Sequence, residues 1–195
     1  AIINARSENM PNDKIKNAIQ KGTSGESLNN LFEIRYEGYG YNGVAVIIET
    51  ITDNKNRTAS EVRTTLNKHG GNLAENGAVS FNFERIGELT FEKNNKNYEN
   101  LLEEAIEAGA SDFSEKDNLI IIHCSTTNLG KIRDKLVINF GEPKSIKLIW
   151  KVLNTISVSD NIFNKVLALC EALEDNEDVQ AVYTNLVLEK NINKC

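Results

Sequence analysis

The chain has 195 residues, of which 40% are hydrophobic and 26% charged, an ordinary composition for a globular protein that buries a core. Its formal net charge of −6 does not suggest a nucleic-acid binder, because such binding requires cationic surface. No apolar run approaches membrane-spanning length, and nothing resembles a secretory signal. The cysteines are odd in number and widely spaced, which indicates a reducing compartment and neither a disulfide framework nor a zinc site: Cys124, Cys170 and Cys195.

Residues 1–30 have the pattern of helical segments. Residues 1–8 can finish one helix, and Pro11 fits the first position of a second helix whose apolar face is followed by Gly22 as a C-cap. This helix is basic through three lysines, for which we consider both a solvated face and a contact with nucleic acid: Lys14, Lys16 and Lys21.

A predicted strand at 32–36 leads into the most informative stretch of the chain, residues 36–63. Three glycines within six residues predict a sharp turn, and the nearly unbroken apolar run 44–51 predicts a strand that is buried on both faces. A polar turn follows, and Thr58 and Glu61 have the spacing of a capping box that opens a helix. Because a helix N-terminus attracts anions, this is the best candidate site: Lys55, Asn56, Arg57, Thr58 and Arg63.

The helix at 59–68 is predicted to stop at Gly70, and the alternating residues of 78–83 predict a half-buried strand. A second pattern then begins with a strand at 88–91 and a helix capped by Asn97. Strands at 111–113 and 118–124, a helix opened by Thr126 or Thr127, and a strand at 144–152 complete the order β-α-β-β-α-β of a ferredoxin-like domain.

The first pattern resumes after residue 152. A strand at 154–158, a helix capped by Ser159 or Asp160, and a strand at 178–183 that can continue to Leu188 supply the missing elements. The predicted fold is therefore α+β, with two ferredoxin-like βαββαβ domains of which one is inserted into the other. The predicted domains are a remnant of an N-terminal helical domain, a discontinuous domain and an inserted domain: 1–30, 31–85 with 153–190, and 86–152.

Several short motifs follow one another along the chain: YEGYG at 36–40, NG at 42–43, TDNKNRT at 52–58, EVR at 61–63, GGNL at 70–73, EAGA at 107–110 and DVQxVY at 178–183. Through these motifs the chain resembles the YebC family, whose members include the mitochondrial translational activator of cytochrome oxidase. The chain departs from the family in two places. Tyr41 stands where proline is common, and the basic opening helical segment has no counterpart, so we expect the chain to begin partway through the first domain.

The resemblance implies three domains, the second and third alike, and a non-enzymatic regulator of gene expression that binds nucleic acid. The family has been described both as a ribosome-associated translation factor and as a DNA-binding transcriptional regulator. We favour translation, because no helix of this chain is a convincing reader of a DNA groove. The expected target is ribosomal RNA or DNA, without a membrane or a cofactor. The expected location is the cytoplasm or an organellar matrix.

The sequence does not indicate an enzyme or a metal site. There is no nucleophile elbow, phosphate-binding loop or metal-ligand spacing. His69 fits a helix end, where a cation complements the dipole, and alternation places His123 and Cys124 on opposite faces of a strand. Tyr39 and Tyr41 can either stack on bases or pack over a strand edge.

Two alternatives belong to other functional classes. Paired ferredoxin-like domains can sense small molecules, which requires an apolar pocket with convergent polar groups. An acidic adaptor would bind a basic protein through 86–152, where carboxylates are frequent.

Overall fold

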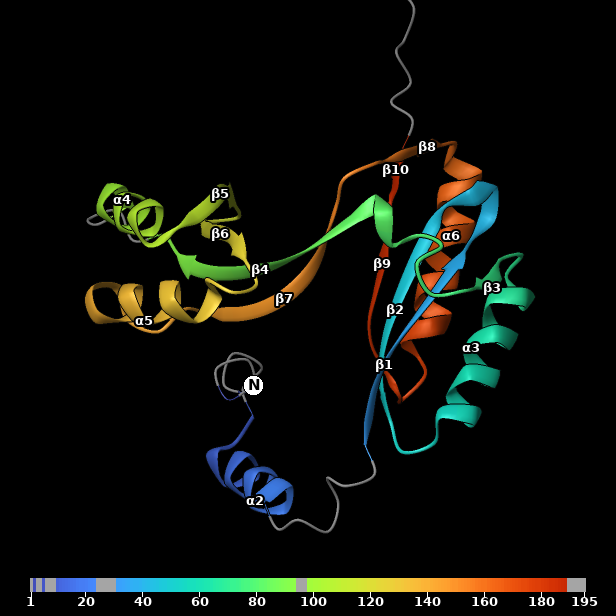
Figure 1. The fold of residues 1–195 in the computed structure, drawn as a ribbon, viewed down its shortest axis with the longest axis horizontal. Coiled ribbons are helices and arrows are strands. Elements are labelled where there is room, and N and C mark those ends of the chain that lie inside the picture. The colour runs from blue at the N-terminus through green and yellow to red at the C-terminus, as the bar shows by residue number, and fades with distance from the viewer. Residues whose placement is uncertain (1, 3–4, 6–9, 24–30, 94–97, 189–195) are drawn as a thin grey trace, which may run out of the picture. The chain divides into compact units, whose positions relative to one another are not determined.

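The computed structural model of the chain describes residues 1–195 except 1, 3–4, 6–9, 24–30, 94–97 and 189–195 (Figure 1). It divides into two units, one formed by residues 1–24 and 85–151 and the other by residues 25–84 and 152–195. Each unit contains a four-stranded sheet, and the α+β class with two ferredoxin-like domains is confirmed. The separate status of 1–30 as a remnant domain stays a prediction.

The unit around residues 85–151 follows the predicted order closely. Its sheet has the spatial order β5-β6-β4-β7, in which β4 and β5 both pair antiparallel with β6. A two-residue turn joins β5 to β6, and both of its residues, Asp117 and Asn118, have positive φ, as hairpin turns of this length prefer. The elements are α2 (Asn12–Thr23), β4 (Phe83–Glu92), α4 (Tyr98–Ala108), β5 (Ala110–Lys116), β6 (Leu119–Ser125), α5 (Leu129–Phe140) and β7 (Ser145–Val152).

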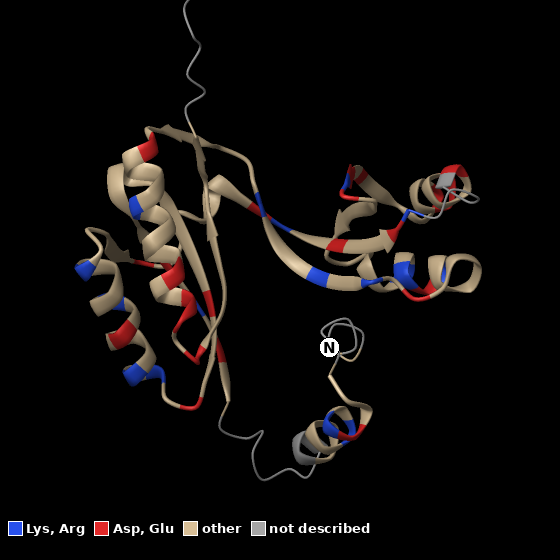
Figure 2. Cartoon of the chain, turned by 180° about the vertical axis from the view of Figure 1, so that it is seen from behind, with Lys and Arg blue, Asp and Glu red and all other residues tan. Residues whose placement is uncertain are grey.

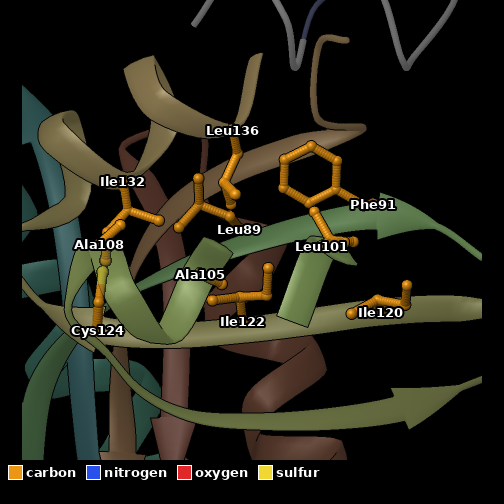
Figure 3. Packing of buried hydrophobic residues seen from close by; sticks show 10 residues of the cluster. All are labelled: Leu89, Phe91, Leu101, Ala105, Ala108, Ile120, Ile122, Cys124, Ile132 and Leu136. Carbon is orange, nitrogen blue, oxygen red and sulfur yellow. The ribbon is translucent and has the colours of Figure 1, made fainter. Parts of the chain in front are cut away.

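The core of this unit lies between one face of the sheet and helices α4 and α5 (Figure 3). Alternate residues of β4 and β6 point into it, and the helices contribute residues at helical spacing. The core consists of Leu89, Phe91, Leu101, Ala105, Ala108, Ile120, Ile122, Cys124, Ile132 and Leu136. His123 lies on the opposite face from Cys124, with Nε2 3.2 Å from Oε2 of Glu88, which confirms the alternation.

The second unit has a sheet of spatial order β3-β1-β2-β9, with helices α3 and α6 on one face. Strands β1 and β2 pair antiparallel, as do β1 with β3 and β2 with β9. Its elements are β1 (Phe32–Tyr39), β2 (Ala45–Thr52), α3 (Lys55–Lys68), β3 (Asn72–Ala74), β8 (Ile156–Val158), α6 (Asp160–Glu174), β9 (Val179–Thr184) and β10 (Leu186–Leu188).

The strands that correspond to each other in the βαββαβ pattern occupy the same places in the two sheets. Along the chain, however, they follow one another in a different order in the second unit. In the first unit the strand after the first helix, β5, lies at one edge, and the strand after the second helix, β7, lies at the other. In the second unit β3 and β9 hold these edge positions, so β2 is the first strand of the βαββαβ order and β1 is the third. The third strand therefore comes first in the chain and is joined to β2 by a hairpin.

The predicted strand at 78–83 is wrong, because residues Ser80–Asn82 form a 3-10 helix and β4 starts only at Phe83. The edge strand of the sheet is β3, six residues earlier. The physical reason lies in Glu37, whose buried carboxylate accepts hydrogen bonds from the backbone N–H groups of Val79 and Ser80. These donors therefore bond to a side chain and not to a neighbouring strand.

The predicted strand at 154–158 does form at its second half, but it does not join the four-stranded sheet. Strand β8 pairs in parallel with β10, and these two make a separate two-stranded sheet. The chain leaves the main sheet at Asn185, which is 1% exposed. Its side chain accepts a hydrogen bond from Ala45 N at 2.8 Å and donates one to Asn154 O at 2.9 Å, and so fixes the point where β9 ends.

Candidate nucleic-acid interface

Helix α3 starts four residues earlier than the sequence predicts. Its N-cap is Asn54, whose side chain accepts a hydrogen bond from Arg57 N at 3.1 Å. Thr58 is therefore not the cap but a buried residue of the first turn. As a result Lys55, Asn56 and Arg57 lie inside the helix and not ahead of it. The free N–H groups of the helix end are those of its first residues, next to the Lys55 side chain.

The guanidinium of Arg57 is already paired with two carboxylates. Its Nη2 lies 3.0 Å from Oδ1 of Asp53 and 2.9 Å from Oδ2 of Asp178. The Thr58 hydroxyl donates a 2.6 Å hydrogen bond to Asp178, and together with Arg57 it lowers the pKa of that carboxyl. Asp178 therefore stays ionised at neutral pH, and Arg57 serves to join α3 to the start of β9.

Other cations of α3 remain open to solvent. Lys55, Arg63 and Lys68 are exposed, and within the described part of the chain no ion pair includes them. The Lys55 ammonium lies 3.9 Å from the centroid of the Phe32 ring, a cation–π contact that holds its stem against β1. Lys68, in the last turn, is a cation that the sequence reasoning missed, although a basic residue at a helix end is a known signal.

The tyrosines near the glycine turn have structural partners. The Tyr39 hydroxyl donates a 2.8 Å hydrogen bond to Ala78 O. The Tyr41 ring packs against the buried cluster around Val44 and lies 5.0 Å from the Lys165 ammonium. Both rings are half-buried, so packing accounts for them more directly than stacking on bases does.

The remaining predicted basic residues lie in α2. Lys14, Lys16 and Lys21 all belong to this helix, and Lys14 and Lys16 are exposed. Helix α2 belongs to the unit formed by residues 1–24 and 85–151, whereas α3 belongs to the other unit.

The charges of the second unit are divided between its two helices. Figure 2 shows Lys and Arg along α3, whereas α6 carries Asp and Glu. Helix α3 contains four cations and one carboxylate: Lys55, Arg57, Arg63 and Lys68, with Glu61. Helix α6 contains three carboxylates and Lys165, and the turn after it adds Asp175 and Glu177. Cationic surface is therefore concentrated on one helix of an otherwise acidic unit.

A pocket of about 580 Å³ lies next to the first turn of α3. Its polar lining includes four carboxylates and the paired Arg57, and only Leu31 and Ile51 are large and apolar. Small-molecule sites are mostly apolar with a few polar groups, so this pocket does not match that description. Among the described residues no group of three or more His, Cys, Asp or Glu could hold a metal ion. Within the same residues no helix has the length and apolarity needed to span a membrane.

Comparison with known proteins identifies the family. A model of a transcriptional-regulator family, described as the second and third domain of TACO1/YebC, matches residues 31–186. The chain belongs to the TACO1/YebC family. It is also similar to a conserved hypothetical protein of Aquifex aeolicus, Aq1575, whose crystal structure matches with a TM-score of 0.82 and 36% sequence identity. That match covers 98% of this chain and 79% of the other. The predicted resemblance to YebC is confirmed, and the family is one of regulators.

Proposed function

We propose that this TACO1/YebC protein is a non-enzymatic regulator of gene expression that contacts RNA of the translation machinery through the exposed cations of α3. The observation that carries the proposal is the unpaired cationic surface of this helix in a chain of net charge −6. A protein that binds a polyanion gains free energy by displacing condensed counterions, and among the described residues of the second unit only this helix offers several exposed cations for that purpose.

The positions of the cations suit phosphate contacts. Lys55 and Arg63 are eight residues apart, which corresponds to about 12 Å along a helix at 1.5 Å per residue. Asn56 adds an exposed amide in the first turn, next to backbone N–H groups that favour anions. In this proposal Arg57 orients the turn and does not itself contact the phosphate, because its guanidinium is paired with Asp53 and Asp178.

The surroundings of α3 favour RNA over duplex DNA as the target. A helix that reads DNA lies in the major groove between two phosphate strands. Helix α6 packs beside α3, and its acidic side chains would face one of these strands. An RNA loop or single strand can approach α3 from the side away from α6, with no second phosphate strand beside the carboxylates.

The test measures binding of the full chain to purified ribosomes, to single-stranded RNA and to duplex DNA over a series of salt concentrations. Replacing both Lys55 and Arg63 by Ala should weaken RNA or ribosome binding. It should also reduce the slope of log K against log salt concentration by about 1.4, or about 0.7 for each lost contact. Arg133→Ala is the matched control, because Arg133 is exposed but paired with Asp134 in the other unit. Equal binding and equal slopes for the double variant and its parent would refute the proposed site.

A further inference from the structure

Proteins protect the edges of their sheets, because the unpaired backbone groups of an edge strand can pair with another chain. Three of the four edges of the two main sheets carry such protection. Strand β3 has only three residues. Strand β5 contains a register shift and charged residues, and β7 contains Lys147 and Lys151. These features are the usual means of preventing pairing at an edge.

The fourth edge, strand β9, has less protection than the other three. Its sequence is VQAVYT, with six residues and neither a charge nor a proline. A register shift lies at its start, opposite Glu49 and Thr50, and the residues from Ala181 to Thr184 pair with β2 without interruption. Among the described residues only β2 pairs with β9, so its other edge is available for a further strand.

The register shows which backbone groups point outward from β9. Ala181 and Tyr183 lie opposite Glu49 and Ile47 of β2. At the end of the strand Asn185 N donates to Ala45 O. Because hydrogen-bonded residues alternate along an antiparallel pair, Ala181 and Tyr183 bond to β2 in the same way. The N–H and C=O groups of Val182 and Thr184 therefore point away from β2, whereas the N–H of Gln180, the extra residue at the register shift opposite Glu49, points toward β2.

The charges around β9 indicate what could pair with it. Helix α6 packs on β9 and carries Glu171 and Glu174 on its exposed surface, and Asp175 and Glu177 lie in the turn that leads into the strand. No ion pair among the described residues neutralises these four carboxylates. A nucleic acid would be repelled here, whereas a basic polypeptide would be attracted.

We propose that the outer edge of β9 binds an extended segment, rich in Lys or Arg, of a partner protein, which adds a fifth strand next to β9. The backbone groups of Val182 and Thr184 supply the hydrogen bonds, and the carboxylates of α6 and the following turn select a basic segment. This surface does not overlap the cations of α3. The inference therefore goes beyond the RNA contact and does not depend on it.

The test uses the full chain and two synthetic peptides of eight residues, one alternating Lys and Val and the other alternating Glu and Val. We expect the basic peptide to bind and to slow hydrogen exchange at the amides of Val182 and Thr184. Thr184→Pro removes one outward N–H without removing a bond to β2, so binding should weaken about tenfold. Thr184→Ala is the matched control, because it removes the same side chain but keeps the N–H, and should bind like the parent.

Several results would overturn the inference. These are binding of neither peptide, equal binding of both, or protection confined to amides outside β9. Equal affinity of Thr184→Pro and Thr184→Ala would also overturn it. If the proline variant does not fold, the exchange measurement on the parent chain still decides between these outcomes. Replacing Lys55 and Arg63 by Ala should leave binding of the basic peptide unweakened, which separates this surface from α3.

Discussion

Replacing Glu37 by Gln should destabilise the second unit without changing its shape. The Glu37 side chain is 0% exposed, and its Oε2 accepts hydrogen bonds from Val79 N at 2.9 Å and Ser80 N at 3.0 Å. Its Oε1 lies 3.2 Å from Nη2 of Arg35. One carboxylate thus anchors the segment before β4 to the middle of β1.

The expected loss follows from the groups that Glu37 satisfies. A hydrogen bond to a charged group contributes about 1.5–3 kcal/mol, and a neutral one about 0.5–1.5 kcal/mol. Gln keeps one acceptor oxygen but loses the charge, so two bonds weaken and the ion pair with Arg35 disappears. We expect Glu37→Gln to lower the free energy of unfolding by about 2–4 kcal/mol.

The assay can follow each unit by its own aromatic residues. The single tryptophan, Trp150, lies in the first unit, whereas four of the five tyrosines lie in the second. In urea, the tyrosine near-UV signal should shift to lower denaturant in Glu37→Gln, and the Trp150 fluorescence should shift less. Glu33→Gln is the control, because Glu33 lies on the same face of β1 but is exposed, and its effect should stay within about 0.5 kcal/mol.

The pH dependence of the same variant provides a second check. Burial raises the pKa of Glu37, but hydrogen bonds from the backbone of Val79, Gly77 and Ser80 and the charge of Arg35 outweigh it, so the pKa is lowered from 4.5. A lowered pKa gives stability that is present above 4.5 and is lost as the pH falls through the folded-state value. The difference in the free energy of unfolding between the parent and Glu37→Gln should therefore become smaller in acid. Equal stability of Glu37→Gln and Glu33→Gln at neutral pH would refute the reasoning.

Two further predictions concern α3 and the turn after it. Asp178→Asn should lower the free energy of unfolding by about 1–3 kcal/mol at neutral pH, because the Thr58 hydroxyl and a guanidinium lose their charged acceptor. Since the pKa of Asp178 is lowered from 3.8, this loss should shrink as the pH falls below 3.8 and disappear below the folded-state pKa. The released guanidinium should strengthen RNA binding in a filter assay. Gly70→Ala should cost about 1–3 kcal/mol in thermal unfolding, because its φ is +69° and a Cβ would lie 2.5 Å from the Tyr41 ring. Gly130→Ala is the control, because the added Cβ would have no atom within 4 Å, and this variant should be neutral or slightly stabilising.

The sequence predicts the elements of the first unit well, because each has a strong local pattern. The alternation of β6 and the apolar face of α5 can be recognised from their residues alone. In the second unit the strand at 78–83 was wrong, because its alternation is real but its backbone donors bond to Glu37. The break at Asn185 was also missed, because the residues that bond to it are Ala45 and Asn154, both distant in the chain.

The binding role of the candidate site stays a prediction, but its local structure can be compared with the motif. The motif predicts a helix at 59–68 with Lys55 ahead of it, whereas α3 already starts at Lys55 and includes both Lys55 and Arg63. The pairing of Arg57 could not be predicted, because Asp178 lies 121 residues later in the chain. A motif shows which charges lie together locally, but not which of them are neutralised by residues from a distant segment.

The nested arrangement of the two units determines when each can fold during synthesis. Strand β2 needs β9 as its neighbour, so its pairing of Val46 with Thr184 must wait until residue 184 has left the ribosome. Residues 85–151 form a continuous segment and can fold earlier, which brings the ends of this segment together and lowers the entropy lost when β2 meets β9. In nascent chains stalled before residue 178, a protease should therefore cleave 32–74 readily and leave 85–151 resistant.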